Sequence, residues 1–252
     1  MFEKLKDNWF NYAIEAWCLG TFMVSACMFG VLLFHSASPV AELSAMSKNV
    51  LMGVAMGATA VGIIVSPWGK RSGAHFNPAV TLTFLRLGKI AGRDAFFYII
   101  SHFVGGFVGV LISWLILGDL LADSMVNFVA TVPGGMGGTA AFVAEMLISF
   151  VMMLTILFAS HSARFMHLTP LLAGALLAIY ITFESPISGT SLNPARTFAT
   201  AAISGNWTGW WIYFLAPPIA MLAAGEVFIR TKATRVAVRT MPQTKFSSEL
   251  SA

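Results

Sequence analysis

The sequence predicts an all-α integral membrane protein with six transmembrane helices and two re-entrant half-helices, arranged as an inverted repeat. Three observations predict this class. The 252 residues are 57% hydrophobic and only 10% charged, with a mean hydropathy of +0.78, which is far too apolar for a soluble domain of this length. Long apolar runs alternate with short polar breaks. One stretch of sequence also occurs twice, once in each half of the chain.

The repeated stretch has Asn-Pro-Ala at its centre. It reads Ser-Gly-Ala-His-Phe-Asn-Pro-Ala-Val-Thr at residues 72–81 and Ser-Gly-Thr-Ser-Leu-Asn-Pro-Ala-Arg-Thr at residues 188–197. Asn is a favourable N-cap, and Pro suits the first helical position, where no backbone N–H is needed. Each copy therefore predicts a helix that starts at Asn77 or Asn193 and continues for roughly 11 residues, about half of a ~30 Å hydrocarbon core. We expect two half-helices.

The apolar runs give the spans in order. They predict membrane helices over residues 12–34, 50–65, 95–117, 140–160, 168–183 and 210–229, with a half-helix after the second and the fifth. The polar lead, residues 1–10, lacks a signal-peptide cleavage site, so we expect the first span to be retained. Residues 118–138 are polar and glycine-rich and form the seam between the halves. The prediction is one membrane domain over residues 1–252, with repeats at about 10–117 and 139–230 and a polar tail, 231–252.

The basic residues predict the orientation. All Lys and Arg except Lys48 and Arg196 fall on the side that carries both termini. The positive-inside rule then places both termini in the cytoplasm, with the chain in the inner (plasma) membrane of the cell. An odd number of spans in each half inverts the second repeat, so the Asn-bearing ends of the half-helices should meet near the midplane. Because the basic residues sit at the ends of spans, their pattern argues against nucleic acid as a partner. Cys18 and Cys27 lie too far apart on the first span for a disulfide or a metal site.

At this point the chain resembles the aquaporins and aquaglyceroporins, the major intrinsic proteins, over nearly its whole length. The resemblance lies in the stretches 15–22, 72–82 and 189–198 and in Glu145 of the fourth span. The residues of the two Asn-Pro-Ala stretches, which we call boxes, are most similar to those of nodulin-like intrinsic proteins and their bacterial relatives. The resemblance implies an aquaporin-like fold, a passive channel in the lipid bilayer, a homotetramer and no cofactor or metal.

The candidate site follows from the two boxes and from the charges within spans. We expect Asn77 and Asn193 at the pore centre, donating hydrogen bonds to a permeating molecule, although both could be helix caps only. Loop backbone at five positions should line the pore: Gly73, Ala74, His75, Gly189 and Ser191. Buried acids and a histidine, namely Glu15, Glu145 and His102, are interpreted as braces for the re-entrant backbone, with substrate binding or proton relay as the alternative. Glu184 falls near the predicted outer mouth, where the sequence favours a solvated carboxylate.

The resemblance also predicts an outer constriction, the selectivity filter. The family builds it from one residue in span two, one in span five, one in the second loop and the arginine after the second box. Counting without gaps from the Asn residues gives Gly57, Ile181, Thr190 and Arg196, and a slip of one residue would substitute Met56 for Gly57. A charge at mid-membrane depth costs about 2.5–3.5 kcal/mol on insertion scales, which lining an aqueous pore explains better than a buried ion pair does. Gly57 and Ile181 replace the aromatic ring and histidine of water-selective members, which predicts a wide, less polar aperture. Two features argue against wide solute selection: Thr197 stands where the glycerol-selective branch has Asp, and span six keeps the pair Tyr213-Phe214.

The predicted function is passive conduction of water and small uncharged solutes such as polyols, urea, ammonia or metalloid hydroxides. The positive ends of both half-helices and Arg196 should exclude cations and protons. A strictly water-selective aquaporin is the first alternative. A secondary transporter would need a coupling-ion site, and no Asp lies within a span. A structural junction protein of the same fold is a third reading. An enzyme is not expected, because no nucleophile and base can be placed together.

Overall fold

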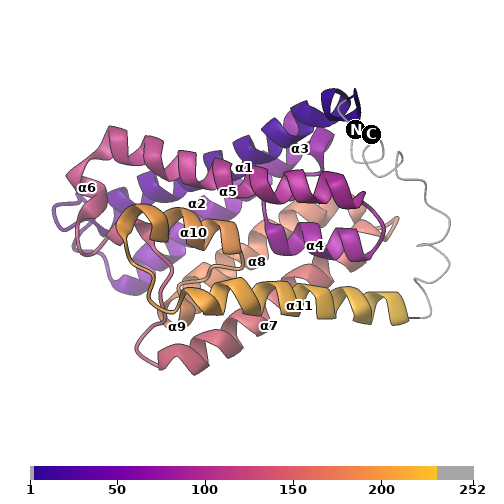
Figure 1. The fold of residues 1–252 in the computed structure, drawn as a ribbon. Helices are drawn as coiled ribbons and strands as arrows, with labels where there is room; N and C mark the ends of the chain where they lie inside the picture. Colours follow the sequence, from indigo (N-terminus) through magenta and orange to yellow (C-terminus); the bar gives the residue numbers. More distant parts are fainter. Residues whose placement is uncertain (1–2, 232–252) are drawn as a thin grey trace.

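The protein is a bundle of long helices that run roughly side by side (Figure 1). The computed structural model describes residues 3–231, and every regular element in that range is helical. The six long helices are α1 (Glu3–Phe34), α2 (Ala45–Val65), α5 (Gly92–Leu117), α7 (Gly137–Ser160), α8 (Thr169–Phe183) and α11 (Trp210–Arg230). With the turn η2 (Met166–Leu168) ahead of α8 included, all six are long and apolar enough to cross a membrane. The prediction of six spans is confirmed.

Most of the long helices extend beyond the predicted spans at their N-terminal ends. α2 starts at Ala45 rather than at residue 50, because Ser44 caps it by accepting a hydrogen bond from the backbone N–H of Ser47. α1 already begins at Glu3, within the polar lead. Hydrophobicity marks only the part of a helix that lies in lipid, whereas the backbone hydrogen bonds continue into the polar flanks.

The short elements form two matching re-entrant segments, which we call corners. α3 (Pro67–Ser72) and α4 (Pro78–Arg86) follow α2, and α9 (Ser185–Ser188) and α10 (Pro194–Ser204) follow α8. α4 and α10 are the two predicted half-helices, and each begins one residue after its capping Asn. The seam between the halves is less irregular than expected, since it holds α6 (Asp119–Ala122) and the single turn η1 (Asn127–Val129).

The packing relates the two halves of the chain. α1 packs along α5, α7 packs in the same way along α11, and α2 pairs with α8 between them. Each half-helix packs on the last span of the other half, α4 on α11 and α10 on α5. This arrangement is the predicted inverted repeat, in which each re-entrant corner is enclosed by both halves (Figure 1). The repeat limits at 10–117 and 139–230 stay a prediction, and the predicted tail from residue 232 lies outside the described residues.

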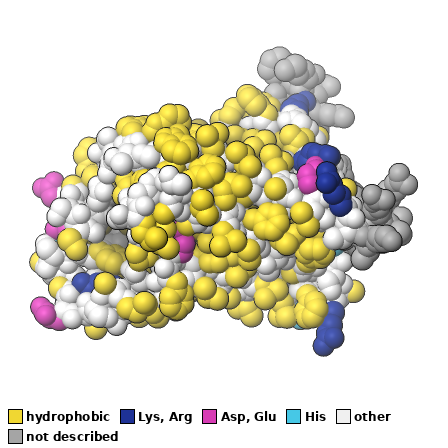
Figure 2. All heavy atoms as spheres, turned by 90° about the horizontal axis from the view of Figure 1, so that it is seen from below, with side chains coloured by type: hydrophobic (Ala, Val, Ile, Leu, Met, Phe, Trp, Pro, Cys, Tyr) yellow, Lys and Arg dark blue, Asp and Glu magenta, His cyan; other side chains and the backbone are white. Residues whose placement is uncertain are grey.

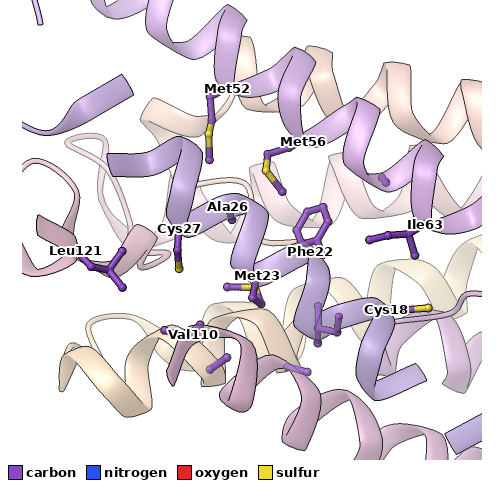
Figure 3. Close-up of a cluster of buried hydrophobic side chains, with 14 of the residues drawn as sticks. Cys18, Phe22, Met23, Ala26, Cys27, Met52, Met56, Ile63, Val110 and Leu121 are labelled. Carbon is purple, nitrogen blue, oxygen red and sulfur yellow. The ribbon is translucent and has the colours of Figure 1, made fainter. Parts of the chain in front are cut away.

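Close helix packing depends on glycine at specific positions. A Cβ atom at Gly105 of α5 would overlap the backbone of Ala16 in α1, so only glycine permits this approach. Small residues at helix contacts are typical of membrane bundles, in which association relies on close van der Waals packing. Beside this contact lies a cluster of buried apolar side chains between α1 and α2, in which Met56 of α2 points toward Phe22 of α1 (Figure 3).

The surface has two polar ends and an apolar band between them. In the face shown in Figure 2, most Lys and Arg side chains gather at one end, most acidic side chains lie toward the other, and a wide hydrophobic band separates the two ends. We use "near face" for the end where α1 begins and α11 ends, and "far face" for the opposite end. The near face carries Arg71, Arg86, Arg164 and Arg230, whereas Glu42, Asp119 and Asp123 lie on the far face.

Candidate permeation pathway

Each repeated box folds as a loop that ends in a capped half-helix. Asn77 and Asn193 have extended backbones, with φ of −154° and −147°, and occupy the N-cap positions of α4 and α10. The Oδ1 atom of Asn77 accepts from the Ala79 N–H at 2.9 Å, and that of Asn193 accepts from the Ala195 N–H at 3.0 Å. Because both amide oxygens are held by helix N-termini, both NH₂ groups must point away from their own helices.

The two corners are joined by a reciprocal pair of hydrogen bonds. Asn77 Nδ2 donates to the Leu192 carbonyl at 2.8 Å, and Asn193 Nδ2 donates to the Phe76 carbonyl at 2.8 Å. Each amide therefore crosses to the loop of the other repeat. An amide NH₂ carries two hydrogens, and both Asn residues also line the central cavity. One N–H of each amide fixes the loops, which leaves the second for a molecule in the cavity.

A buried glutamate holds each loop from the side. The Glu15 carboxylate in α1 accepts from the backbone N–H groups of His75 at 3.1 Å and Phe76 at 2.7 Å. Glu145 in α7 accepts from those of Ser191 at 2.6 Å and Leu192 at 2.8 Å. Each carboxylate also accepts a third hydrogen bond from a side chain. The donor is His102 Nε2 for Glu15, at 2.8 Å, and Ser188 Oγ for Glu145, at 2.9 Å. Both carboxylates are fully buried, so these donors replace the hydration that the membrane interior removes.

Two tyrosines complete the loops, and the sequence reasoning missed their bracing role. The hydroxyl of Tyr98 in α5 donates to the Ser72 carbonyl at 2.8 Å. That of Tyr213 in α11 donates to the Ser188 carbonyl at 2.6 Å. Their spacing carried a usable signal, since each Tyr follows its Ser by nearly the same distance, 26 and 25 residues. Tyr213 was noted only as a trait of water channels.

The loop backbone between the glycines and the Asn residues is strained in the same way in both copies. Gly73 and Gly189 are left-handed, which glycine adopts at little cost. Ala74 and Phe76 in the first loop, like Thr190 and Leu192 in the second, also have positive φ. Left-handed backbone at residues with a Cβ costs about 1–2 kcal/mol each. The glutamate and tyrosine contacts are what maintain this conformation.

A cavity connects these elements. Its volume is about 160 Å³, sufficient for several water molecules. It extends from Ser160 and Thr169 near the near face, past both Asn residues, to Arg196. Of the predicted lining residues, Gly73, Ala74, His75 and Ser191 border it. Gly189 does not, because it packs against the backbone of Thr131 and Val132.

The two histidines are held in the wall. The His75 ring borders the cavity, stacks on Phe84 with 4.8 Å between ring centroids, and its Nδ1 lies 3.0 Å from Thr81 Oγ1. His102 is fully buried and contacts Glu15. Tyr98 packs edge-on against both rings, with centroid distances of 5.3 Å to His75 and 6.3 Å to His102. Among residues 3–231, no group of three or more His, Cys, Asp or Glu could hold a metal ion.

Arg196 places a positive charge at the end of the cavity. It lies in the first turn of α10, where its backbone N–H donates to Asn193 Oδ1 at 3.3 Å. Its Nη1 atom is buried and has no hydrogen-bond partner among the described residues. A guanidinium has five N–H donors and keeps its charge at any physiological pH. Arg196 therefore contributes a fixed cation to the lining of the cavity.

Comparison with known proteins agrees with this geometry. The family model described as "Major intrinsic protein" matches residues 4–228. The chain belongs to the major intrinsic protein family. Aquaporin-4 of Mus musculus is 33% identical over 67% of the chain and 52% of its own length. Aquaporin NIP1-2 of Arabidopsis thaliana is 31% identical over 78% of the chain and 69% of its own length.

The chain spans about half the length of the first curated relatives that it matches. Its fold is similar to the X-ray structure of the aquaglyceroporin from Plasmodium falciparum, with a TM-score of 0.77 over 91% of this chain and 98% of that one. At 18% identity this likeness shows the fold. The relatives carry the names of aquaporins rather than of enzymes.

Of the four residues predicted for the outer constriction of this major intrinsic protein, Arg196 borders the cavity, whereas Gly57, Ile181 and Thr190 do not. Gly57 faces α8, since a Cβ there would lie 2.5 Å from the Gly174 carbonyl oxygen and 3.2 Å from the Ala178 Cβ. A side chain at residue 57 would therefore meet a helix backbone rather than a pore. Met56 lies one position earlier, is 1% exposed and shares a cluster with Ile181, which packs against it. Neither Gly57 nor Met56 borders the cavity, so the span-two residue of the constriction stays a prediction.

The polar side of this region is tied together by hydroxyl groups. Thr197 Oγ1 lies 2.6 Å from Thr131 Oγ1 and 2.6 Å from Ser191 Oγ. The residue that replaces the Asp of the glycerol-selective branch is thus buried in the wall and links the far-face loop to α10. Glu184 is also buried, with 8% exposure, which corrects the expectation of a solvated carboxylate. It accepts a hydrogen bond from the Thr190 hydroxyl.

Proposed function

We propose that this major intrinsic protein is a passive channel for water and small uncharged solutes that excludes ions and protons. The observation that carries the proposal is the reciprocal Asn pair, which brings the N-termini of two half-helices to one point in the cavity. Each N-terminus has roughly half a positive charge. Together with Arg196 they repel cations and oppose proton transfer, while the free amide N–H groups donate to neutral molecules.

The outer constriction combines Met56, Ile181, Thr190 and Arg196 in our proposal. In this proposal Met56 and Ile181, which pack in one apolar cluster, form one side of the constriction, and the guanidinium of Arg196, which borders the cavity, forms the other. A thioether chain is flexible, unlike the aromatic ring that water-selective relatives place in span two. Ile181 removes the polar imidazole of those relatives. Solutes with an apolar face and a polar face, such as small polyols, urea and metalloid hydroxides, fit such an aperture, as do water and ammonia.

The other assignments are supported by the same contacts. Gly73, Ala74, His75 and Ser191 present loop backbone to the permeant, and Glu15, Glu145 and His102 keep the loops in place. By resemblance we propose a homotetramer. From the basic near face we propose that both termini are cytoplasmic and that the protein lies in the plasma membrane. A secondary transporter is less well supported, since the carboxylates of Glu15 and Glu145, which contact the two loops, are occupied by backbone donors. The absence of any solute flux would instead favour a structural junction protein.

Stopped-flow light scattering on proteoliposomes tests the proposal. Water, urea, glycerol, ammonia and boric acid are compared at the same protein density, with a proton-sensitive dye for leakage. We expect non-saturating flux of water and at least one larger solute, without proton flux. Met56→Phe combined with Ile181→His should reduce solute flux at least about tenfold while water flux continues, because a ring and a donor rebuild a water filter. If the unmodified protein passes water and rejects every larger solute, the strictly water-selective alternative holds.

A further inference from the structure

Thr190 has a conformation that needs an explanation. Its φ of 51° is left-handed, although β-branched residues are rarely found there. Such strain persists only when neighbouring groups enforce it, and it concentrates at functional positions. The Thr190 N–H donates to Ser188 Oγ at 3.1 Å, and Ser188 Oγ in turn donates to Glu145. The backbone of Thr190 is therefore held through the same glutamate that holds the rest of the loop.

The side chain of Thr190 is held by a different group. Its hydroxyl donates to Glu184 Oε2 at 2.5 Å and lies 3.4 Å from the Tyr180 carbonyl. Glu184 terminates α8: its N–H donates to the Tyr180 carbonyl at 2.7 Å, and its own carbonyl accepts from the Ile187 N–H at 2.7 Å. The backbone of Glu184, from which the carboxylate extends, is therefore fixed between α8 and α9.

The burial of the Glu184 carboxylate lowers the stability of the fold. The side chain is 8% exposed, and its Oε1 atom is buried without a hydrogen-bond partner among the described residues. Glu15 and Glu145, by contrast, each receive two backbone donors. Ser188 and Thr190 stabilise the Glu184 carboxylate, yet removing a carboxylate from water costs free energy unless further groups compensate. Glu184 interacts electrostatically with Arg196, the cation of the same constriction.

We propose that Glu184 is a positioning residue of the outer constriction, which fixes the Thr190 hydroxyl in the wall and thereby sets solute selectivity. The inference rests on the proposed function, which places Thr190 in the filter. With its proton committed to Glu184, the Thr190 hydroxyl cannot donate to a permeant. The donors that a solute meets then come from Arg196, and Thr190 contributes a fixed, narrow edge.

A double-mutant cycle tests this proposal. The variants are Glu184→Leu, Thr190→Val and the double variant, with Glu184→Gln to keep an acceptor without charge. Glu42→Leu, at an exposed glutamate on the same face, is the matched control. Each is reconstituted in proteoliposomes, and the ratio of urea to water permeability is measured by stopped-flow light scattering. A ratio is independent of the fraction of channels that fold, so a purely structural role would not change it.

We expect Glu184→Leu and Thr190→Val each to change the ratio by about fivefold or more, in the range of one lost hydrogen bond to a charged group. The double variant should change it no further, because Glu184 acts through Thr190. Glu184→Gln should stay within about twofold of the unmodified protein, as should Glu42→Leu. Additive changes in the double variant, or a Glu184→Gln that behaves like Glu184→Leu, would overturn the proposal.

Two further outcomes are separable. If Glu184→Leu does not fold, Thr190→Val still decides, since an unchanged ratio in that variant refutes the role of the bond. If the unmodified protein rejects urea and every other larger solute, the permissive filter fails. In that case the activation energy of water permeation is measured for the same variants. The double variant is again expected to differ from the unmodified protein no more than each single variant does.

Discussion

At the scale of single residues, the pathway is organised by a few side chains that each satisfy backbone groups. Non-helical backbone within a membrane must find partners inside the protein, since lipid supplies none. Glu15 and Glu145 provide acceptors for the loop N–H groups, while Tyr98 and Tyr213 provide donors for the loop carbonyls. The Asn amides bind other backbone groups of the same two loops and helix ends. Their orientation, and therefore their function, depends on these braces.

Glu145→Ala is expected to impair folding rather than selectivity. The substitution leaves three donors without an acceptor, those of Ser188, Ser191 and Leu192. Each unsatisfied buried group costs about 1–3 kcal/mol, so the loss should be at least about 3 kcal/mol. The thermal midpoint of the purified protein in detergent measures it.

Ser149→Ala is the control, one helical turn further along α7. Its hydroxyl is buried without a hydrogen-bond partner among the described residues, so its removal should change the midpoint little. A folded Glu145→Ala protein with altered solute preference would contradict the bracing role.

At the scale of helices, close contacts determine which residues face the pathway. α2 and α8 approach through glycine, with Gly53 and Gly57 of α2 against the backbone of Gly174 and Ala178 in α8. This contact fixes the rotation of α2 about its axis. Met56 is consequently turned toward Phe22 (Figure 3), in the cluster against which Ile181 packs.

Gly57→Ala should therefore destabilise the protein without acting as a filter mutation. The new Cβ would lie 2.5 Å from the Gly174 carbonyl oxygen, so α2 and α8 must separate, at a cost of about 1–3 kcal/mol. Gly62→Ala is the matched control in the same helix, because a Cβ there meets nothing within 4 Å. That control should be neutral or more stable by up to about 1 kcal/mol, since alanine favours helix. Thermal unfolding of both variants makes the comparison. An unchanged midpoint for Gly57→Ala together with lower solute flux would instead place residue 57 in the filter.

At the scale of the whole molecule, the apolar band and the unequal charge of its two faces relate the protein to the bilayer. Lys70, Arg71, Arg86 and Arg164 lie on the near face, and the acidic residues Glu42, Asp119 and Asp123 lie on the far face. Basic residues are retained in the cytoplasm during insertion, so the near face is expected to be cytoplasmic.

Cysteine labelling in intact cells measures this orientation. Cys18 and Cys27 are fully buried, so they should contribute little background. An impermeant maleimide should label Ser44→Cys, exposed on the far face, in intact cells, and Ala163→Cys, exposed on the near face, only after permeabilisation. Labelling in the reverse order would show that the protein inserts with its termini outside.

Much of the fold could be read from the sequence because its signals are local. Hydropathy identified the six spans, since transfer from water to lipid depends on each segment's own composition. Asn followed by Pro marked the starts of α4 and α10, because capping involves only neighbouring residues. The odd number of spans in each half then implied the inverted repeat.

Tertiary structure decided what depends on helix rotation and on contacts distant in sequence. Successive residues of a helix are about 100° apart, so a count that slips by one residue exchanges a pore-facing side chain for a packed one. Gly57 faces α8, whereas Met56 is buried in the cluster with Phe22, and only the contact of α2 with α8 decides which residue takes which place. The crossing of Asn77 and Asn193 to opposite loops, and the burial of Glu184 against Thr190, likewise depend on how the two halves enclose each other. The sequence by itself determined the spans and the two Asn positions, whereas the packing of the halves decided which neighbouring side chains form the walls.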